Sequence, residues 1–348
     1  MKRSASKIRV KMRFLPASFL SRSVGYLERR LLKALKLSGL DTTSIFFGEL
    51  KYNRDFNFLK TYSQAEVFSH YHIQSKRDEF HFFKERHQIV LNDVFLDSKS
   101  GIIFDSTKRI ITESSSWPVD SLLLAAIPKP FFPYRTLKNE EGLIHLPSTG
   151  FYHWLIEDLP PFLKLYQENP KLPLIAHNQI PRYVESTLRL IDREIIYVPH
   201  FVRINRLMTI SRNNDVGWPQ REDIDQVKWF FRDFISEHRS IERVYISRLG
   251  ARRSPSFEKE LIQILSAQGW LILDANHVSF PEQIRIISKA STICGVGGAG
   301  LAGQIWMQDG SRVIELAPKR YIPANSRLAS RLKHDYVCIN YDDNSTNV

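Results

Sequence analysis

The sequence predicts an α/β protein with two lobes, preceded by a basic amphipathic helix and containing a small antiparallel β meander. Between residues 172 and 340, short apolar runs typical of strands alternate with helical segments, which is the pattern of parallel strands joined by helices. The alternation pauses near residue 240 and then starts again. A chain of 348 residues, 43% of them hydrophobic, is long enough to form two domains.

The basic segment comprises residues 1–38. It holds eleven of the 49 Lys and Arg residues but only one of the 37 acidic residues, so most of the net charge of +12 lies there. Residues 19–36 place apolar side chains at helical spacing and basic ones on another face. Such a helix could lie on an anionic membrane surface or pack on the protein with its basic face in solvent. The nearly neutral remainder argues against a nucleic-acid-binding protein.

Two lobes follow the basic segment. Residues 39–240 are predicted to form the N-terminal lobe, in which residues 87–117 alternate like a meander of short antiparallel strands. Residues 241–348 are predicted to form the C-terminal lobe. The predicted strands are 172–176, 194–198, 206–210, 243–247, 270–274, 291–294, 312–316 and 336–340, and the predicted helices are 221–237, 257–267, 281–289 and one from Leu301.

A glycine loop is the strongest single motif. Gly295, Gly297 and Gly300 in "CGVGGAGLAG" fit the pattern G-x-G-x-x-G between a predicted strand and a predicted helix, where backbone amides can bind a phosphate. Glu315 follows at the spacing of a ribose ligand in dinucleotide-binding proteins. However, only 33 residues come after Glu315, so a nucleotide diphosphate fits better than a dinucleotide. A glycine-rich turn without a ligand would have the same spacing.

Arginines follow the predicted strand 243–247. Arg248, Arg252 and Arg253 stand at its carboxyl end, the end at which open α/β sheets bind ligands. The planar guanidinium group suits phosphate oxygens. A solvated basic loop is the alternative interpretation.

The segment "FYHWLIEDLPPF" carries a candidate general base. His153 and Glu157 are four residues apart and share one helix face, while Asp158 lies on the adjacent face. A carboxylate beside an imidazole orients the ring and raises its basicity, as removal of a proton from a hydroxyl requires. A His–Glu surface pair on a core helix would look the same.

No metal or disulfide site is expected. Asp223 and Asp225 lie in the first turn of a predicted helix, where acidic residues favour the helix dipole. Cys294 and Cys338 are too few for a cysteine zinc site or a disulfide framework, so a reducing compartment is expected.

Two motifs together resemble glycosyltransferase family 61. "FYHWLIEDLPPF" is similar to the HWL-x-(D/E)-x-LP segment of that family, and "YISRLGARR … SFPEQIRIISKASTICGVGGAGLAGQIWM … SRVIEL" is similar to its C-terminal signature. The resemblance covers roughly residues 150–316. It implies an inverting enzyme with two Rossmann-like lobes (the GT-B fold) that uses a nucleotide sugar without a metal. Bacterial members commonly stand beside capsule, lipopolysaccharide or exopolysaccharide synthesis.

The resemblance assigns roles to residues of this chain. His153, Glu157 and Asp158 would lie on the acceptor side as the catalytic candidates. The donor-binding candidates are Ser247, Arg248, Arg252, Arg253, Gln283, Gly295, Gly297, Gly298, Ala299, Gly300, Leu301 and Glu315. The loop of the family usually reads G-P-H-G-A-G-L, whereas Val296 and Gly297 replace its Pro and His here. The missing His removes a potential phosphate contact.

The sequence therefore predicts a transferase that moves a sugar to a hydroxyl of a glycan or lipid-linked glycan. The nucleotide sugar is a co-substrate, and no other cofactor and no metal are expected. The predicted location is the cytoplasm, with residues 1–38 as a contact to the inner face of the membrane. Two alternatives stay open, namely an NAD-type Rossmann oxidoreductase and a catalytically inactive scaffold for polysaccharide assembly.

Overall fold

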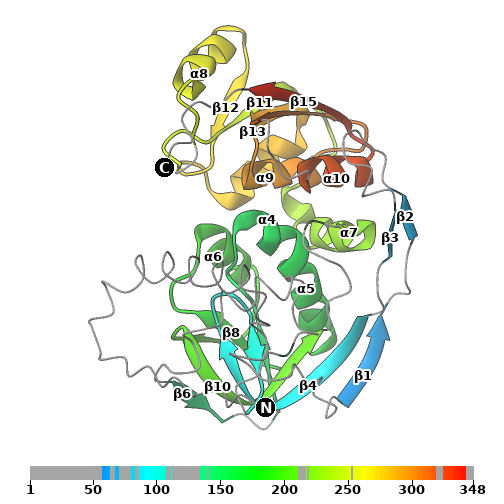
Figure 1. The fold of residues 1–348 in the computed structure, drawn as a ribbon, viewed down its shortest axis with the longest axis vertical. Helices are drawn as coiled ribbons and strands as arrows, with labels where there is room; N and C mark the ends of the chain where they lie inside the picture. Colours follow the sequence, from blue (N-terminus) through cyan, green and yellow to red (C-terminus); the bar gives the residue numbers. More distant parts are fainter. Residues whose placement is uncertain are drawn as a thin grey trace, which may run out of the picture.

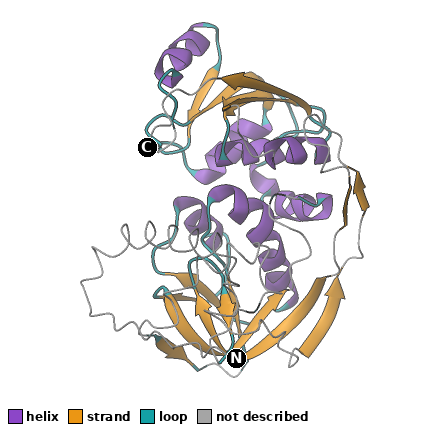
Figure 2. Ribbon diagram, viewed as in Figure 1, coloured by secondary structure: helices purple, strands orange, loops and turns teal. Residues whose placement is uncertain are grey.

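The computed structural model describes a defined part of the chain. The described residues are 57–62, 67–69, 80–82, 86–106, 111, 134–138, 141–210, 217, 219–251, 254–318 and 324–341. The predicted amphipathic helix of residues 19–36 lies outside them, as do Arg252 and Arg253. Within the described part, the structure is a mixed α/β arrangement of two main sheets with helices between them (Figures 1 and 2).

The first sheet is mixed, with the main strand order β1-β4-β10-β7-β8-β9. β4 pairs antiparallel with β1, β5 and β10, whereas β6, β7, β8 and β9 run parallel to their neighbours. Its strands are β1 (Asn57–Tyr62), β4 (Arg86–Asp97), β5 (Ile103–Phe104), β6 (Arg135–Leu137), β7 (Leu143–His145), β8 (Leu174–His177), β9 (Ile195–Val198) and β10 (Phe201–Ile210). β2 (Val67–Ser69) and β3 (Phe80–Phe82) form a separate hairpin.

The predicted meander of residues 87–117 is wrong in its details. β4 is one strand of twelve residues that continues through Asn92 and Asp93, where a turn was expected. Asp93 adopts a φ of +53°, a conformation that Asp tolerates better than most residues, so pairing with β10 continues on both sides of it. The expected crossover between the strands at 194–198 and 206–210 is also absent, because β10 begins at Phe201, three residues after β9 ends.

The second sheet is fully parallel, and its elements follow the prediction closely. Its spatial order is β12-β11-β13-β14-β15, which is 2-1-3-4-5 when its strands are counted along the chain. The connection after β11 therefore runs toward one edge of the sheet, and the connection after β13 runs toward the other edge. Doubly wound sheets bind ligands at such a switch point. The strands are β11 (Ile241–Ser247), β12 (Leu271–Asp274), β13 (Ala290–Val296), β14 (Arg312–Pro318) and β15 (Asp335–Tyr341).

Most of the helices lie between the two sheets, whereas the helix Glu258–Ala267 lies beyond the second sheet (Figures 1 and 2). The α-helices are α4 (Phe151–His153), α5 (Leu159–Glu168), α6 (Arg182–Leu188), α7 (Arg221–Phe230), α8 (Glu258–Ala267), α9 (Phe280–Ser288) and α10 (Ala324–Arg331). Trp154–Asp158 forms a π-helical turn between α4 and α5, and Arg232–Phe234 and Ala299–Trp306 form 3-10 helices. The last of these replaces the α-helix predicted from Leu301, in a segment that contains Gly300 and Gly303.

Aromatic side chains join the two halves of the core. α7 ends seven residues before the predicted helix does, because Phe231 leaves the helical conformation. Its ring instead packs against Phe280 and Trp306, with centroids 5.5 and 5.4 Å away. Trp154 joins the same group through Phe280, and one buried cluster includes residues from both sheets and the helices between them. No helix of the described part is long and apolar enough to cross a bilayer.

Candidate active site

A cleft of about 850 Å³ lies between α6 on one side and the carboxyl ends of β11 and β12 on the other. The first turns of α9 and the 3-10 helix Ala299–Trp306 complete its C-terminal wall. Its position next to the β11/β13 switch point is the one expected of a ligand site in a doubly wound sheet. Its size suits a small-molecule ligand.

Four residues singled out from separate parts of the sequence line this cleft together. They are Ser247 and Arg248 at the end of β11, Gln283 in α9, and Gly300 in the glycine loop. The Gln283 amide donates to the carbonyl oxygens of Ala275 (3.1 Å) and Val278 (2.8 Å). Gln283 therefore shapes the turn between β12 and α9 that forms part of the wall.

Arg248 connects β11 to the glycine loop. Its guanidinium group donates to the carbonyl oxygen of Gly297, and a Cβ added at Gly298 would collide with that group. Glycine at position 298 thus gives the arginine room to lie across the loop. A positive charge is in this way fixed at the rim of the cleft.

The glycine loop is less open than its motif suggests. The amide of Gly297 donates to the carbonyl oxygen of Leu316 at 2.7 Å, so it pairs within the fold. Gly295 and Leu301 are buried, whereas Gly297, Gly298, Ala299 and Gly300 are at least partly exposed. A Cβ at Gly295 would lie 3.1 Å from the carbonyl oxygen of Ile246, so strand packing accounts for this glycine without a ligand.

Glu315 lies beneath the loop and not at the cleft. It is 1% exposed, and its carboxylate accepts hydrogen bonds from Asn325 (2.9 Å) and from the Tyr336 hydroxyl (2.6 Å). Burial raises its pKa, although these two hydrogen bonds act in the opposite direction. Because successive side chains of a strand point to opposite faces of the sheet, the Glu315 side chain lies on a buried face of β14, next to Gly297. In this structure it supports the loop and has no access to a ribose in the cleft.

The predicted His–Glu pair forms on the neighbouring helix. The Nδ1 atom of His153 lies 2.9 Å from Glu157 Oε2, and the Glu157 carboxylate also accepts the amide of Gly217 at 2.7 Å. Glu157 is 4% exposed, so a buried carboxylate orients a histidine whose side chain is 29% exposed. His153 does not itself line the cleft, but Phe151, half a turn earlier, does.

Electrostatics around His153 favour its charged form. Burial lowers its pKa, but the hydrogen bond that it donates to Glu157 and the charges of Glu157 and Asp158 outweigh this effect, so the pKa lies above its usual value. The pair lies at the start of the π-helical turn. Such turns are rare and occur frequently at functional sites.

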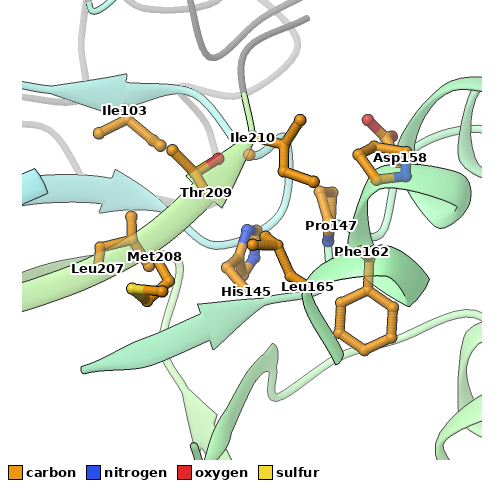
Figure 3. A pocket seen from close by; sticks show the side chains of 12 residues that line it. Ile103, His145, Pro147, Asp158, Phe162, Leu165, Leu207, Met208, Thr209 and Ile210 are labelled. Atoms are coloured by element: carbon orange, nitrogen blue, oxygen red, sulfur yellow. The ribbon is translucent and has the colours of Figure 1, made fainter. Parts of the chain in front are cut away.

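Asp158 faces another direction. It lines a cavity of about 30 Å³ on the far side of the helix, together with His145 and Pro147 (Figure 3). One of its carboxylate oxygens accepts the Thr149 hydroxyl at 2.5 Å. The cavity has room for a water molecule but not for a sugar, so the cavity that Asp158 lines is not a substrate site, although its charge still acts on His153.

The α6 wall was not found from the sequence. Arg182, Glu185, Ser186 and Arg189 line the cleft from this helix and its end. Their spacing of three, four and seven residues is the signature of one helix face and could have drawn attention to it. Arg182 donates to the carbonyl oxygen of Asn276 at 2.6 Å, which links the two walls of the cleft.

Among the described residues, no cluster of three His, Cys, Asp or Glu side chains is arranged to hold a metal ion. Asp223, one of the two acids of the D-x-D pattern, lies in the first turn of α7 and is buried. Asp225 instead pairs with Arg221 at 2.9 Å.

Comparison with known proteins agrees with the motifs. The family model Glycosyltransferase 61 matches residues 151–314, from the first residue of α4 into β14. This match supports glycosyltransferase family 61 and, with it, a glycosyltransferase activity in general terms. A search of curated proteins found none that matches the chain.

Proposed function

We propose that this protein transfers a sugar from a nucleotide-sugar donor, bound in the 850 Å³ cleft, to a hydroxyl group of an acceptor. One observation carries the proposal. Ser247, Arg248, Gln283 and Gly300 line a single cleft at the switch point of the second sheet. In this proposal the two sheets belong to the two lobes of a GT-B enzyme.

The diphosphate of the donor would lie against Arg248 and the exposed part of the glycine loop. Arg248 already lies across that loop through the Gly297 carbonyl oxygen. As the bond between the sugar and the diphosphate breaks, negative charge grows on the leaving oxygen. A fixed guanidinium group stabilises this charge most in the transition state, so we propose that transfer needs no metal ion and continues in EDTA.

The acceptor would be activated by His153. Its Nδ1 atom is held by Glu157, so Nε2 is the atom that would take the proton of the acceptor hydroxyl. The acceptor oxygen forms a bond to the anomeric carbon while the diphosphate leaves from the opposite face, which inverts the anomeric centre. Glu157 stabilises the imidazolium that results. Closure of the cleft would bring His153 to the substrate, since lobe motions of this kind are common in transferases.

The acceptor class follows only from the family resemblance. We propose a glycan or lipid-linked glycan used in the synthesis of capsule, lipopolysaccharide or another surface polysaccharide. Residues 1–38 would then hold the enzyme on the inner, anionic face of the membrane, because they concentrate positive charge.

The oxidoreductase alternative loses its main support. A dinucleotide fingerprint needs an acidic residue that reaches a ribose, and Glu315 is buried against Asn325 and Tyr336 instead. The alternative of a catalytically inactive scaffold can be distinguished by experiment. It predicts that the protein binds a membrane surface but transfers no sugar.

Thermal unfolding in the presence of UDP-, GDP- and CMP-sugars and of NADH tests the proposal, because a ligand of the native state raises the melting temperature. We expect at least one nucleotide sugar to raise the Tm of the wild type and of Arg312→Ala, a control at the opposite end of β14 where Arg312 pairs with Asp335. Arg248→Ala should show a smaller shift. A shift with NADH alone would overturn the proposal.

A further inference from the structure

Glu258 is a fully buried carboxylate directly behind the cleft. It is the first residue of α8, and its side chain is 0% exposed. A carboxylate is expensive to bury unless hydrogen bonds replace the water that it loses. Its partners therefore indicate what it does.

Three donors surround the Glu258 carboxylate. Oε1 accepts the backbone amide of Arg248 at 2.5 Å and the hydroxyl of Tyr245 at 3.2 Å, and Oε2 accepts the hydroxyl of Ser254. Burial and the neighbouring Glu258 raise the pKa of Tyr245, so its hydroxyl stays protonated and donates. The donors come from β11, from the residue after it and from the segment before α8, so one carboxylate ties both ends of the loop that carries Arg248.

A relay leads from this carboxylate to the glycine loop. Glu258 holds the backbone of Arg248, and the guanidinium group of the same residue holds the carbonyl oxygen of Gly297. Glu258 does not line the cleft, whereas Arg248 does. An effect of Glu258 on a ligand in the cleft is therefore indirect, and Arg248 is the cleft residue that it holds directly.

We infer that Glu258 is a positioning residue of the donor site, which fixes Arg248 where its guanidinium group meets the diphosphate of the donor. The inference rests on the proposed function. It assigns to Glu258 a role in the discrimination between one and two phosphates, because the guanidinium group that it positions would act on the diphosphate and not on the nucleoside.

The variant Glu258→Gln tests this role. Glutamine keeps an oxygen that accepts the Arg248 amide but lacks the negative charge that strengthens all three hydrogen bonds. Titration calorimetry with UDP, UMP, GDP and GMP shows whether uridine or guanosine nucleotides bind more tightly. For the tighter-binding nucleoside it gives the ratio of diphosphate to monophosphate affinity. We expect Glu258→Gln to weaken diphosphate binding about tenfold and monophosphate binding less than twofold. Glu260→Gln, an exposed residue of the same helical turn, is the matched control and should match the wild type.

A double-mutant cycle separates positioning from a general structural role. If Glu258 acts through Arg248, then Glu258→Gln should have no further effect on diphosphate binding in an Arg248→Ala background. Ser254→Ala removes one of the three donors and should give a smaller loss, about threefold, which keeps the test usable if Glu258→Gln folds poorly.

Three results would overturn the inference. These are unchanged diphosphate affinity in Glu258→Gln or, where that variant is unfolded, in Ser254→Ala; equal losses for monophosphate and diphosphate; and additive losses in the double mutant. Failure of the wild-type protein to bind any of the four nucleotides, together with the absence of a thermal shift with every nucleotide sugar, would instead remove the proposed function, and the inference with it.

Discussion

Replacing Gly297 with alanine tests why this chain differs at that position from the loop of the family that its motifs resemble. A Cβ added there would lie 2.9 Å from Glu315 Oε1 and 3.4 Å from the carbonyl oxygen of Leu316. Real Cβ atoms essentially never approach another atom within 3.0 Å, so the Glu315 side chain must move. It is held by Asn325 and Tyr336, and it cannot yield without straining one of these hydrogen bonds.

The size of the effect follows from two opposing contributions. Forcing extra volume into a packed site costs about 1–3 kcal/mol. Alanine also reduces the freedom of the unfolded chain, which returns about 0.4–1 kcal/mol. We therefore expect Gly297→Ala to lower the free energy of unfolding by roughly 1–2 kcal/mol. Histidine, which stands at this position in the loop pattern that the chain resembles, requires the same Cβ and should cost at least as much.

Urea denaturation followed by circular dichroism measures this change. Gly150→Ala is the control, since a Cβ there meets nothing within 4 Å and should cost about 0.5–1 kcal/mol at most, as an alanine at a helix N-cap. The double variant Gly297→Ala/Glu315→Asp should lose less than the sum of its single changes, because the shorter side chain withdraws from the new methyl group. A Gly297→Ala protein as stable as Gly150→Ala, or strict additivity in the double variant, would refute this reasoning.

Four further predictions concern the site and the residues around it. Glu157→Gln should abolish transfer measured with the donor identified by thermal shift and leave its binding intact, whereas Arg248→Ala should abolish transfer and weaken donor binding; turnover in both variants would remove the assignment of these roles. Because the pKa of His153 is raised and a base must be neutral, kcat/KM should rise with pH and level off only above the usual histidine value of about 6.5. The same raised pKa stabilises the fold below pH ~6.5 and loses this contribution as the pH rises through the higher folded pKa, so His153→Ala should cost more stability at pH 6 than at pH 8.5; a pH-independent cost would contradict the shift. Burial raises the pKa of Cys294 to about 12, so a thiol reagent at pH 8 should label the more accessible Cys338 first and Cys294 only on unfolding, as mass spectrometry of the labelled peptides would report.

The second sheet could be predicted well because its information is local. Each of its strands is a short apolar run between helical segments, and the observed β11–β15 lie within a residue or two of the predicted ranges. The first sheet was predicted only in part: β8 and β9 match their predicted ranges, but β4 was missed because it pairs with β10, more than a hundred residues away. A turn-like Asn92-Asp93 sequence does not end a strand that has such a partner. Strand pairing across this distance leaves no periodic signal in the sequence.

The candidate site was also predicted only in part from the sequence. Residue types and spacing were enough to identify the His153–Glu157 pair and to select Arg248 as a ligand-site candidate, and the resemblance to glycosyltransferase family 61 added Ser247 and Gln283. Only the folded chain showed that the last three share a cleft with α6. Likewise, only the fold showed that Asp158 faces a different cavity.

The amino-acid sequence by itself determined the chemistry available to this protein and the order of its elements, since both follow from neighbouring residues and their periodicity. The tertiary structure alone decided which carboxylates reach a ligand. Glu315 and Glu258 are both charged residues beside predicted ligand segments, yet each is turned inward and held by buried donors. Their orientation depends on side chains from other strands and helices, and such contacts exist only once the chain has folded.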